Sequence, residues 1–61
     1  MLKLAIIRQR RGLSQRALAE IANVGPITIA RLETGVYDPR LSTLRQLAKA
    51  LNVSVRDLLD E

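Results

Sequence analysis

The chain has 61 residues, with 10 Lys and Arg against 6 Asp and Glu, and a formal net charge of +4. It contains no Cys and no His, which excludes disulfides and the common zinc sites and removes the usual general base of enzymes. No apolar run approaches the roughly 20 residues of a membrane span, and the start is too short and too soon charged for a signal peptide. We expect one small cytoplasmic domain over residues 1–61, either complete as given or a fragment of a longer protein, with no enzymatic activity, cofactor, metal, membrane partner or small-molecule ligand.

The charges are distributed unevenly along the sequence. Residues 1–16 contain no acid, and they hold Lys3, Arg8, Arg10, Arg11 and Arg16; three acids, Asp57, Asp60 and Glu61, fall within the last five residues. A basic end is expected if one face meets a polyanion, although solubility charge explains the composition equally simply. The three terminal acids are more typical of solvated charge than of a metal site. The single aromatic residue, Tyr37, argues against stacking on single-stranded bases.

The first predicted helix covers residues 4–11. Ile7 lies on its inward face, and Arg8 lies beside that face. Leu2 and Ile6 form a second apolar pair on the opposite side. This pair either packs against the C-terminal segment or forms a surface for self-association.

A second helix is predicted to begin after Ser14, whose hydroxyl can accept from a free backbone N–H of the first turn. Leu18, Ile21 and Ala22 fall on one stripe, which predicts their burial. Asn23 tolerates the left-handed conformation that often ends a helix. The segment is therefore expected to turn sharply at Asn23.

A third helix is predicted to follow Gly25, with Pro26 at its first position and Gly35 at its end. Ile29 and Leu32 share its inward face. The outward residues are Ile27, Arg31 and Thr34, with Ala30 beside them. Small or apolar outer residues with one Arg are unusual for a solvated face and suit a helix that enters a groove. Residues 14–35 are thus predicted to form two short helices joined by a tight turn.

The remaining chain predicts a turn-rich connection over residues 36–40 and two further helices. Leu44, Leu47, Ala48 and Leu51 follow the i, i+3, i+4, i+7 pattern of a helix with one buried face. Its outer residues are Arg45, Gln46 and Lys49.

Asn52 is expected to end this helix, and a last short helix is expected between Asn52 and the C-terminus. Ser54 and Asp57 have the spacing of a capping box. Leu58 and Leu59 either close the core or contribute to a dimer contact. The sequence as a whole predicts an all-α domain of five short helices around one core.

Ordered motifs in this sequence resemble those of the lambda-repressor/Cro-like, or XRE-type, helix-turn-helix family. The likeness runs from about residue 4 to residue 59 and is carried by GLSQ (12–15), ALAE (17–20), TIARLETG (28–35), LSTL (41–44), LAKALNVS (47–54) and DLL (57–59). The resemblance implies a lambda-repressor-like fold whose second motif helix enters the major groove of double-stranded DNA. It also implies a nucleoid-associated transcriptional regulator of bacterial, archaeal or phage type that forms a homodimer, at least on DNA.

The resemblance places the base-reading positions at Pro26, Ile27 and Arg31, with Gln15 touching the DNA backbone and sometimes a base. Arg31 can form two hydrogen bonds with a guanine edge, although a phosphate contact is equally compatible with its position. Ile27 can pack on a thymine methyl group. The family usually has polar residues where Pro26 and Ile27 stand, so we expect modest specificity or a contribution from groove shape.

Phosphate contacts are expected near the start of the second helix, where free N–H groups attract anions. The candidates are Gln15, Arg16, Thr28, Thr34, Arg10, Arg11 and Arg40. Thr34 has an alternative role in ending its helix, and the arginines have the alternative of being solvated.

Glu33 lies at the edge of an inward face, where an isolated charge would be costly. The resemblance implies that it forms an ion pair with Arg8.

A different function on the same fold is a protein-interaction module, such as an antitoxin or anti-repressor partner. Two apolar patches are candidates for a homodimer contact: Leu41, Val53, Val55 and Leu59, or Leu2 with Ile6.

Overall fold

The computed structural model describes residues 3–36 and 38–59. These residues form five helices, which confirms the predicted all-α architecture. In chain order they are α1 (Leu4–Arg10), α2 (Gln15–Ala22), α3 (Pro26–Thr34), α4 (Leu41–Leu51) and α5 (Val55–Leu58). None of these helices is long and apolar enough to cross a membrane.

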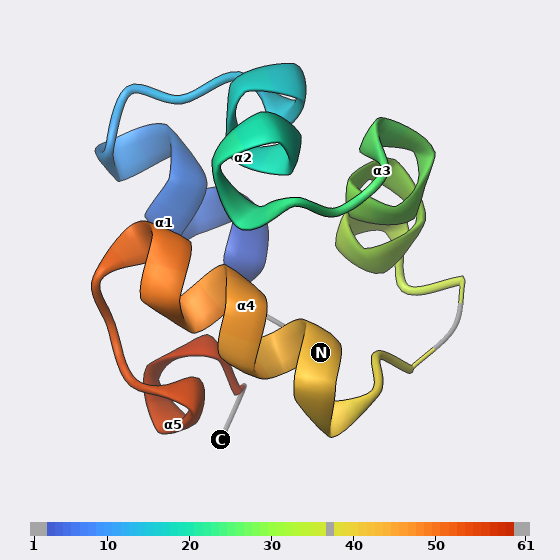
Figure 1. Cartoon of the computed structure of the whole chain (residues 1–61), viewed down its shortest axis with the longest axis vertical. Helices are drawn as coiled ribbons and strands as arrows, with labels where there is room; N and C mark the ends of the chain where they lie inside the picture. Colours follow the sequence, from blue (N-terminus) through green and yellow to red (C-terminus); the bar gives the residue numbers. More distant parts are fainter. Residues whose placement is uncertain (1–2, 37, 60–61) are drawn as a thin grey trace.

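Helix α2 packs against both α3 and α4. Helix α4 also contacts α5, and α1 reaches α3. In Figure 1, α3 stands at the right-hand edge of the molecule, and α5 lies at the lower left. The arrangement therefore leaves one long side of α3 free of other helices.

One hydrophobic core joins all five helices, because each of them contributes at least one buried side chain. The side chains with almost no exposed surface are Leu4, Leu18, Ile29, Leu47, Leu51 and Leu58. Leu44 and Ala48 of α4 are also buried, as their spacing predicts. A domain of this size has little surface to bury, so its stability depends on this single cluster and on well-formed helix ends.

The ends of α2 and α3 are formed by the residues that the sequence predicts. Ser14 Oγ accepts a hydrogen bond of 3.0 Å from the Ala17 N–H. Asn23 ends α2 with φ 57°, and Gly35 ends α3 with φ 77°, both in the left-handed region. Pro26 occupies the first turn of α3, where its missing N–H leaves no hydrogen bond unmade.

The last two helix boundaries also agree with the sequence. Asn52 ends α4 with φ 57°. Ser54 and Asp57 form a reciprocal capping box, in which each side chain accepts a hydrogen bond from the other residue's backbone N–H at 3.1 Å. Leu58 is fully buried, whereas Leu59 keeps 43% of its surface exposed. Leu58 therefore closes the core, and Leu59 does not.

The predicted buried stripe of α2 is wrong in one position. Ile21 is 58% exposed, and Ala19 is buried in its place. Leu18 and Ala22 lie at the middle of the buried face, and Ala19 extends that face to the side away from Ile21. Ile21 therefore lies just outside the opposite edge of the buried face.

The proposed pair of Leu2 and Ile6 is described only in part. Ile6 is 53% exposed, whereas Leu2 lies outside the described residues. The expectations that concern Tyr37, Asp60 and Glu61 also fall on residues that the structure does not describe.

Candidate nucleic-acid interface

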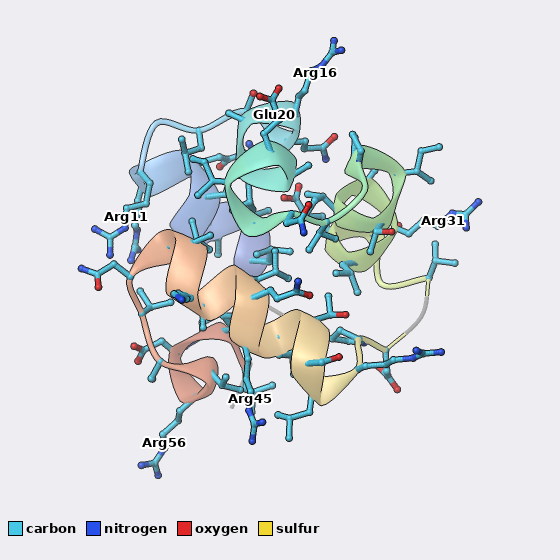
Figure 2. All side chains as sticks on the ribbon, in the orientation of Figure 1. Arg11, Arg16, Glu20, Arg31, Arg45 and Arg56 are labelled. Atoms are coloured by element: carbon cyan, nitrogen blue, oxygen red, sulfur yellow. The ribbon has the colours of Figure 1, made fainter. Side chains whose placement is uncertain are left out.

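Helix α3 is anchored by one face and exposed by the other. Ile29 and Leu32 are buried in the core, with at most 3% of their surface exposed. On the outer side, Ile27 is 66% exposed, and Pro26 and Arg31 are exposed as well. Figure 2 shows the Arg31 side chain extending away from the body of the molecule. The three residues expected to read bases thus share one accessible surface.

The start of α2 lies beside α3 and carries two exposed polar residues, Gln15 and Arg16. Arg16 points outward from α2 in Figure 2, and its guanidinium is free of contacts with the rest of the drawn molecule. Its position suits a contact with a phosphate, because a flexible charged side chain at a helix start reinforces the positive end of the helix dipole.

On the other side of α3, Thr28 and Arg40 line one shallow groove. The same groove is lined by Asp38, Pro39 and Thr43. The structure therefore brings two predicted phosphate contacts together. The Asp38 carboxylate beside them opposes the binding of an anion, which makes this groove less favourable than the start of α2.

Arg10 and Arg11 do not join this surface. Arg11 Nε donates a hydrogen bond of 3.0 Å to the carbonyl of Leu51, at the end of α4. In Figure 2, Arg11 lies on the side of the molecule opposite Arg31. Arg10 lines a groove with Arg11 and Lys3 between α1 and the C-terminal part of the chain. A DNA duplex lying against α3 would leave both arginines on the far side.

Thr34 is used inside its own helix. Its Oγ1 donates a hydrogen bond of 3.0 Å to the carbonyl of Arg31. This carbonyl also accepts a backbone hydrogen bond of 3.1 Å from the Val36 N–H, and the Thr34 contact occupies the one hydroxyl proton that a phosphate would need. The structure therefore favours the alternative in which Thr34 helps to end α3.

The ion pair expected between Arg8 and Glu33 is formed. Arg8 Nε donates to Glu33 Oε2 at 2.6 Å, and Arg8 Nη2 donates to Glu33 Oε1 at 3.1 Å. Arg8 Nη1 donates to the Leu13 carbonyl at 2.7 Å. The side chains are only 11% and 8% exposed, respectively. This pair connects α1 to α3 and to the segment that precedes α2.

Glu33 receives a third hydrogen bond, which the sequence does not reveal. Gln15 Nε2 donates to Glu33 Oε1 at 3.0 Å. Burial alone would raise the pKa of the Glu33 carboxyl, but hydrogen bonds from Arg8 and Gln15 and the Arg8 charge hold that pKa below its usual value. The hydrogen bond to Glu33 raises the pKa of Arg8. Both groups are therefore charged at neutral pH.

The basic residues do not gather on one face. Figure 2 shows Arg16 and Arg31 around α2 and α3, Arg11 on the opposite side, and Arg45 and Arg56 at the bottom. Among the described residues, these labelled arginines are thus spread over several sides of the molecule. Within the described part of the chain, no group of three acidic, His or Cys residues is placed to hold a metal ion.

Comparisons with known proteins agree with this geometry. Residues 4–58 match the family described as helix-turn-helix. The HTH-type transcriptional regulator PuuR of Escherichia coli (strain K12) is 36% identical over 59 residues, which cover 97% of this chain and 32% of the regulator.

Two further relatives are similar over the same region. The immunity repressor protein of Bacillus phage phi105 is 39% identical over 59 residues, covering 97% of this chain and 41% of the repressor. The HTH-type transcriptional regulator DdrOP3 of Deinococcus deserti is 36% identical over 58 residues, covering 95% of this chain and 45% of the regulator. The chain spans less than half the length of each of these relatives. The family match covers nearly the whole sequence and all five helices, and the chain therefore belongs to the lambda-repressor-like helix-turn-helix family.

Proposed function

We propose that this chain binds specific sequences of double-stranded DNA as a transcriptional regulator of the repressor type, with α3 in the major groove. The observation that carries the proposal is the position of α3, which is held by buried Ile29 and Leu32 and exposes Pro26, Ile27 and Arg31. Family membership and relatives that are transcriptional regulators and a phage repressor support the same function.

Arg31 is the proposed reader of base sequence. Its exposed guanidinium can donate two hydrogen bonds to the O6 and N7 atoms of guanine, which discriminates against other bases by about 1–3 kcal/mol. Ile27, with 66% of its surface exposed, provides an apolar contact for a thymine methyl group. Pro26 adds a contact of the same apolar kind at the start of the helix.

Phosphate contacts are proposed for Gln15 and Arg16 at the start of α2 and for Thr28 and Arg40 beside α3. They position the duplex without reading its sequence. Contacts from Arg10 and Arg11 would require DNA to extend around the molecule, and Thr34 would have to give up its internal hydrogen bond.

We also propose that two copies bind together on a site with two related half-sites. A two-fold dimer of such domains places its half-sites about one helical turn apart. Of the patch expected from the sequence, Leu41 and Leu59 leave 54% and 43% of their surfaces exposed and offer apolar surface for contact between the copies. Val53 and Val55 are half-buried and pack against the core, so they contribute less to such a contact.

The test begins with selection from a random duplex library, followed by titration of the selected and a scrambled duplex at several salt concentrations. Two related half-sites and a clear preference over the scrambled duplex are expected. Binding without preference would remove the sequence-specific part of the proposal. No binding even at low salt would remove DNA binding altogether.

Single substitutions then separate the proposed roles. Arg31→Ala should weaken the selected site more than scrambled DNA, whereas Arg16→Ala should weaken both equally and lower the salt slope by about one unit. Arg45→Ala is the matched control, because Arg45 lies far from α3 in Figure 2. Equal losses on all sequences for both test variants would make Arg31 a phosphate contact.

A protein-interaction module on the same fold is the second candidate. The exposed Ile27 favours it, since an apolar residue 66% exposed at a helix start is also suited to a protein contact. The sequence pI of about 10.8 favours DNA over a protein partner, unless that partner is acidic. Co-purification of an acidic protein, with no DNA binding, would favour this candidate.

A further inference from the structure

The contact between Gln15 and Glu33 fixes which end of the Gln15 carboxamide faces inward. An ionised carboxylate can only accept hydrogen bonds. Gln15 must therefore turn its NH2 group toward Glu33, as in the hydrogen bond of 3.0 Å from Nε2 to Oε1. The Gln15 carbonyl oxygen cannot take this place, because two acceptors would then face each other.

Glu33 is itself held firmly. Both of its carboxylate oxygens accept hydrogen bonds from Arg8, at 2.6 and 3.1 Å, and Arg8 is tied to the Leu13 carbonyl at 2.7 Å. Glu33 exposes only 8% of its side chain, so few other rotamers are open to it. By contrast, Gln15 is exposed and depends on Glu33 for its orientation.

We propose that Glu33 is a positioning residue for DNA binding, which holds the Gln15 carboxamide with its oxygen and one N–H directed away from Glu33. An acceptor beside a donor matches the adenine edge in the major groove, and the free N–H alone matches a phosphate oxygen. In either contact the orientation of the Gln15 side chain is set before DNA arrives. The entropy cost of ordering this side chain is therefore not incurred on binding. This inference rests on the proposed DNA-binding function.

The charge of Glu33 has an opposite effect on affinity. A carboxylate close to DNA repels phosphates, so neutralising it strengthens binding to every sequence. A single Glu33 substitution therefore combines a gain from charge with a loss from orientation. The two effects separate only when the same substitution is compared with and without the Gln15 side chain.

The experiment is a double-mutant cycle of Glu33→Gln and Gln15→Ala, with affinities measured on the selected duplex at a temperature where all variants are folded. Glu33→Gln keeps the shape of the side chain but offers both a donor and an acceptor, so it no longer dictates the orientation of Gln15. We expect it to weaken binding about 5-fold more with Gln15 present than in the Gln15→Ala background. Ser54→Ala, which loses the capping box away from α3, controls for reduced stability and should leave the affinity unchanged.

A second measurement does not depend on DNA. The side-chain NH2 of Gln15 should show an NMR order parameter close to that of the backbone, and this order should fall in Glu33→Ala. Equal order in both proteins would overturn the inference, as would an identical effect of Glu33→Gln in the two Gln15 backgrounds. Failure of the unsubstituted protein to bind any duplex would instead remove the proposed function, with the NMR result still deciding whether Glu33 holds Gln15.

Discussion

Replacing Glu33 with Ala would leave the Arg8 guanidinium with one protein partner, the Leu13 carbonyl, in a site where its side chain is only 11% exposed. Cutting one partner from a fully buried ion pair costs about 3–5 kcal/mol, because the remaining charge is left uncompensated. Arg8 retains some solvent and one hydrogen bond, so we expect a smaller loss of about 2 kcal/mol in the free energy of unfolding. For a domain of this size, such a loss lowers Tm by roughly 8–16 °C.

Thermal unfolding followed by circular dichroism, with urea unfolding at 25 °C, measures this effect directly. Glu20→Ala is the matched control, because it removes an exposed carboxylate from α2. The control should change stability by less than about 0.5 kcal/mol. An unchanged Tm for Glu33→Ala would refute the reasoning, since it would mean that Arg8 finds equivalent solvation without its partner.

Three further predictions follow from individual residues. Because the pKa of Glu33 is lowered by folding, its contribution to stability is fully present above the pKa of an unfolded glutamate, about 4.3, and is lost as the pH falls through the lower folded value. Urea unfolding at a series of pH values should therefore show a smaller acid loss for Glu33→Gln than for the unsubstituted protein; equal losses would assign the acid sensitivity to other carboxylates, such as Asp57. Gly35→Ala should lower the free energy of unfolding, measured in urea, by about 1–2 kcal/mol, because φ is 77° at this position. The added Cβ would meet no atom within 4 Å, so the cost comes from the backbone conformation alone. Ile21→Ala should change the free energy of unfolding by less than about 0.5 kcal/mol, whereas a loss of about 2–5 kcal/mol would mean that Ile21 is buried after all.

The features predicted correctly from sequence are those governed by neighbouring residues. Asn23 and Gly35 end their helices because few other residues adopt a left-handed conformation at low cost. The burial of Leu47 and Leu51 follows from a repeat that fits one face of a long helix. Helix α2 is as clearly amphipathic as α4, but Ile21 lies at the edge of its apolar stripe, and there its burial was predicted wrongly.

The contacts that sequence reasoning missed join distant parts of the chain. The hydrogen bond from Gln15 to Glu33 spans 18 positions, and the one from Arg11 to the Leu51 carbonyl spans 40. No local pattern marks either of them. Arg11 in particular is a residue type that often contacts DNA. Because it lies beside the end of α4, its side chain instead donates a hydrogen bond to the Leu51 carbonyl.

Charge distribution along the sequence was misleading for a related reason. The Lys3 N–H donates a hydrogen bond of 2.9 Å to the Leu58 carbonyl, so Lys3 lies beside α5, the helix that carries Asp57. The Lys3 charge also helps to lower the pKa of Asp57, after the larger effect of hydrogen bonds from Ser54. Lys3 and Asp57, which are far apart in the sequence, are therefore close in space. The charge pattern of the sequence thus does not locate the proposed DNA-binding surface, which is identified from α3 and its surroundings.

The composition of that surface bears on how many copies must bind. One Arg31–guanine contact supplies about 1–3 kcal/mol of discrimination, whereas specific sites are typically preferred over random DNA by about 4–10 kcal/mol. Pro26 and Ile27 add apolar contacts but no hydrogen bonds to bases. Two copies on related half-sites would double the contribution of Arg31 to about 2–6 kcal/mol, which reaches the lower part of the typical range. A single half-site should therefore be preferred over scrambled DNA by only about 5- to 150-fold, the equivalent of about 1–3 kcal/mol, and a preference well above that range would show that contacts beyond Arg31, from Gln15 or from groove shape, carry much of the specificity.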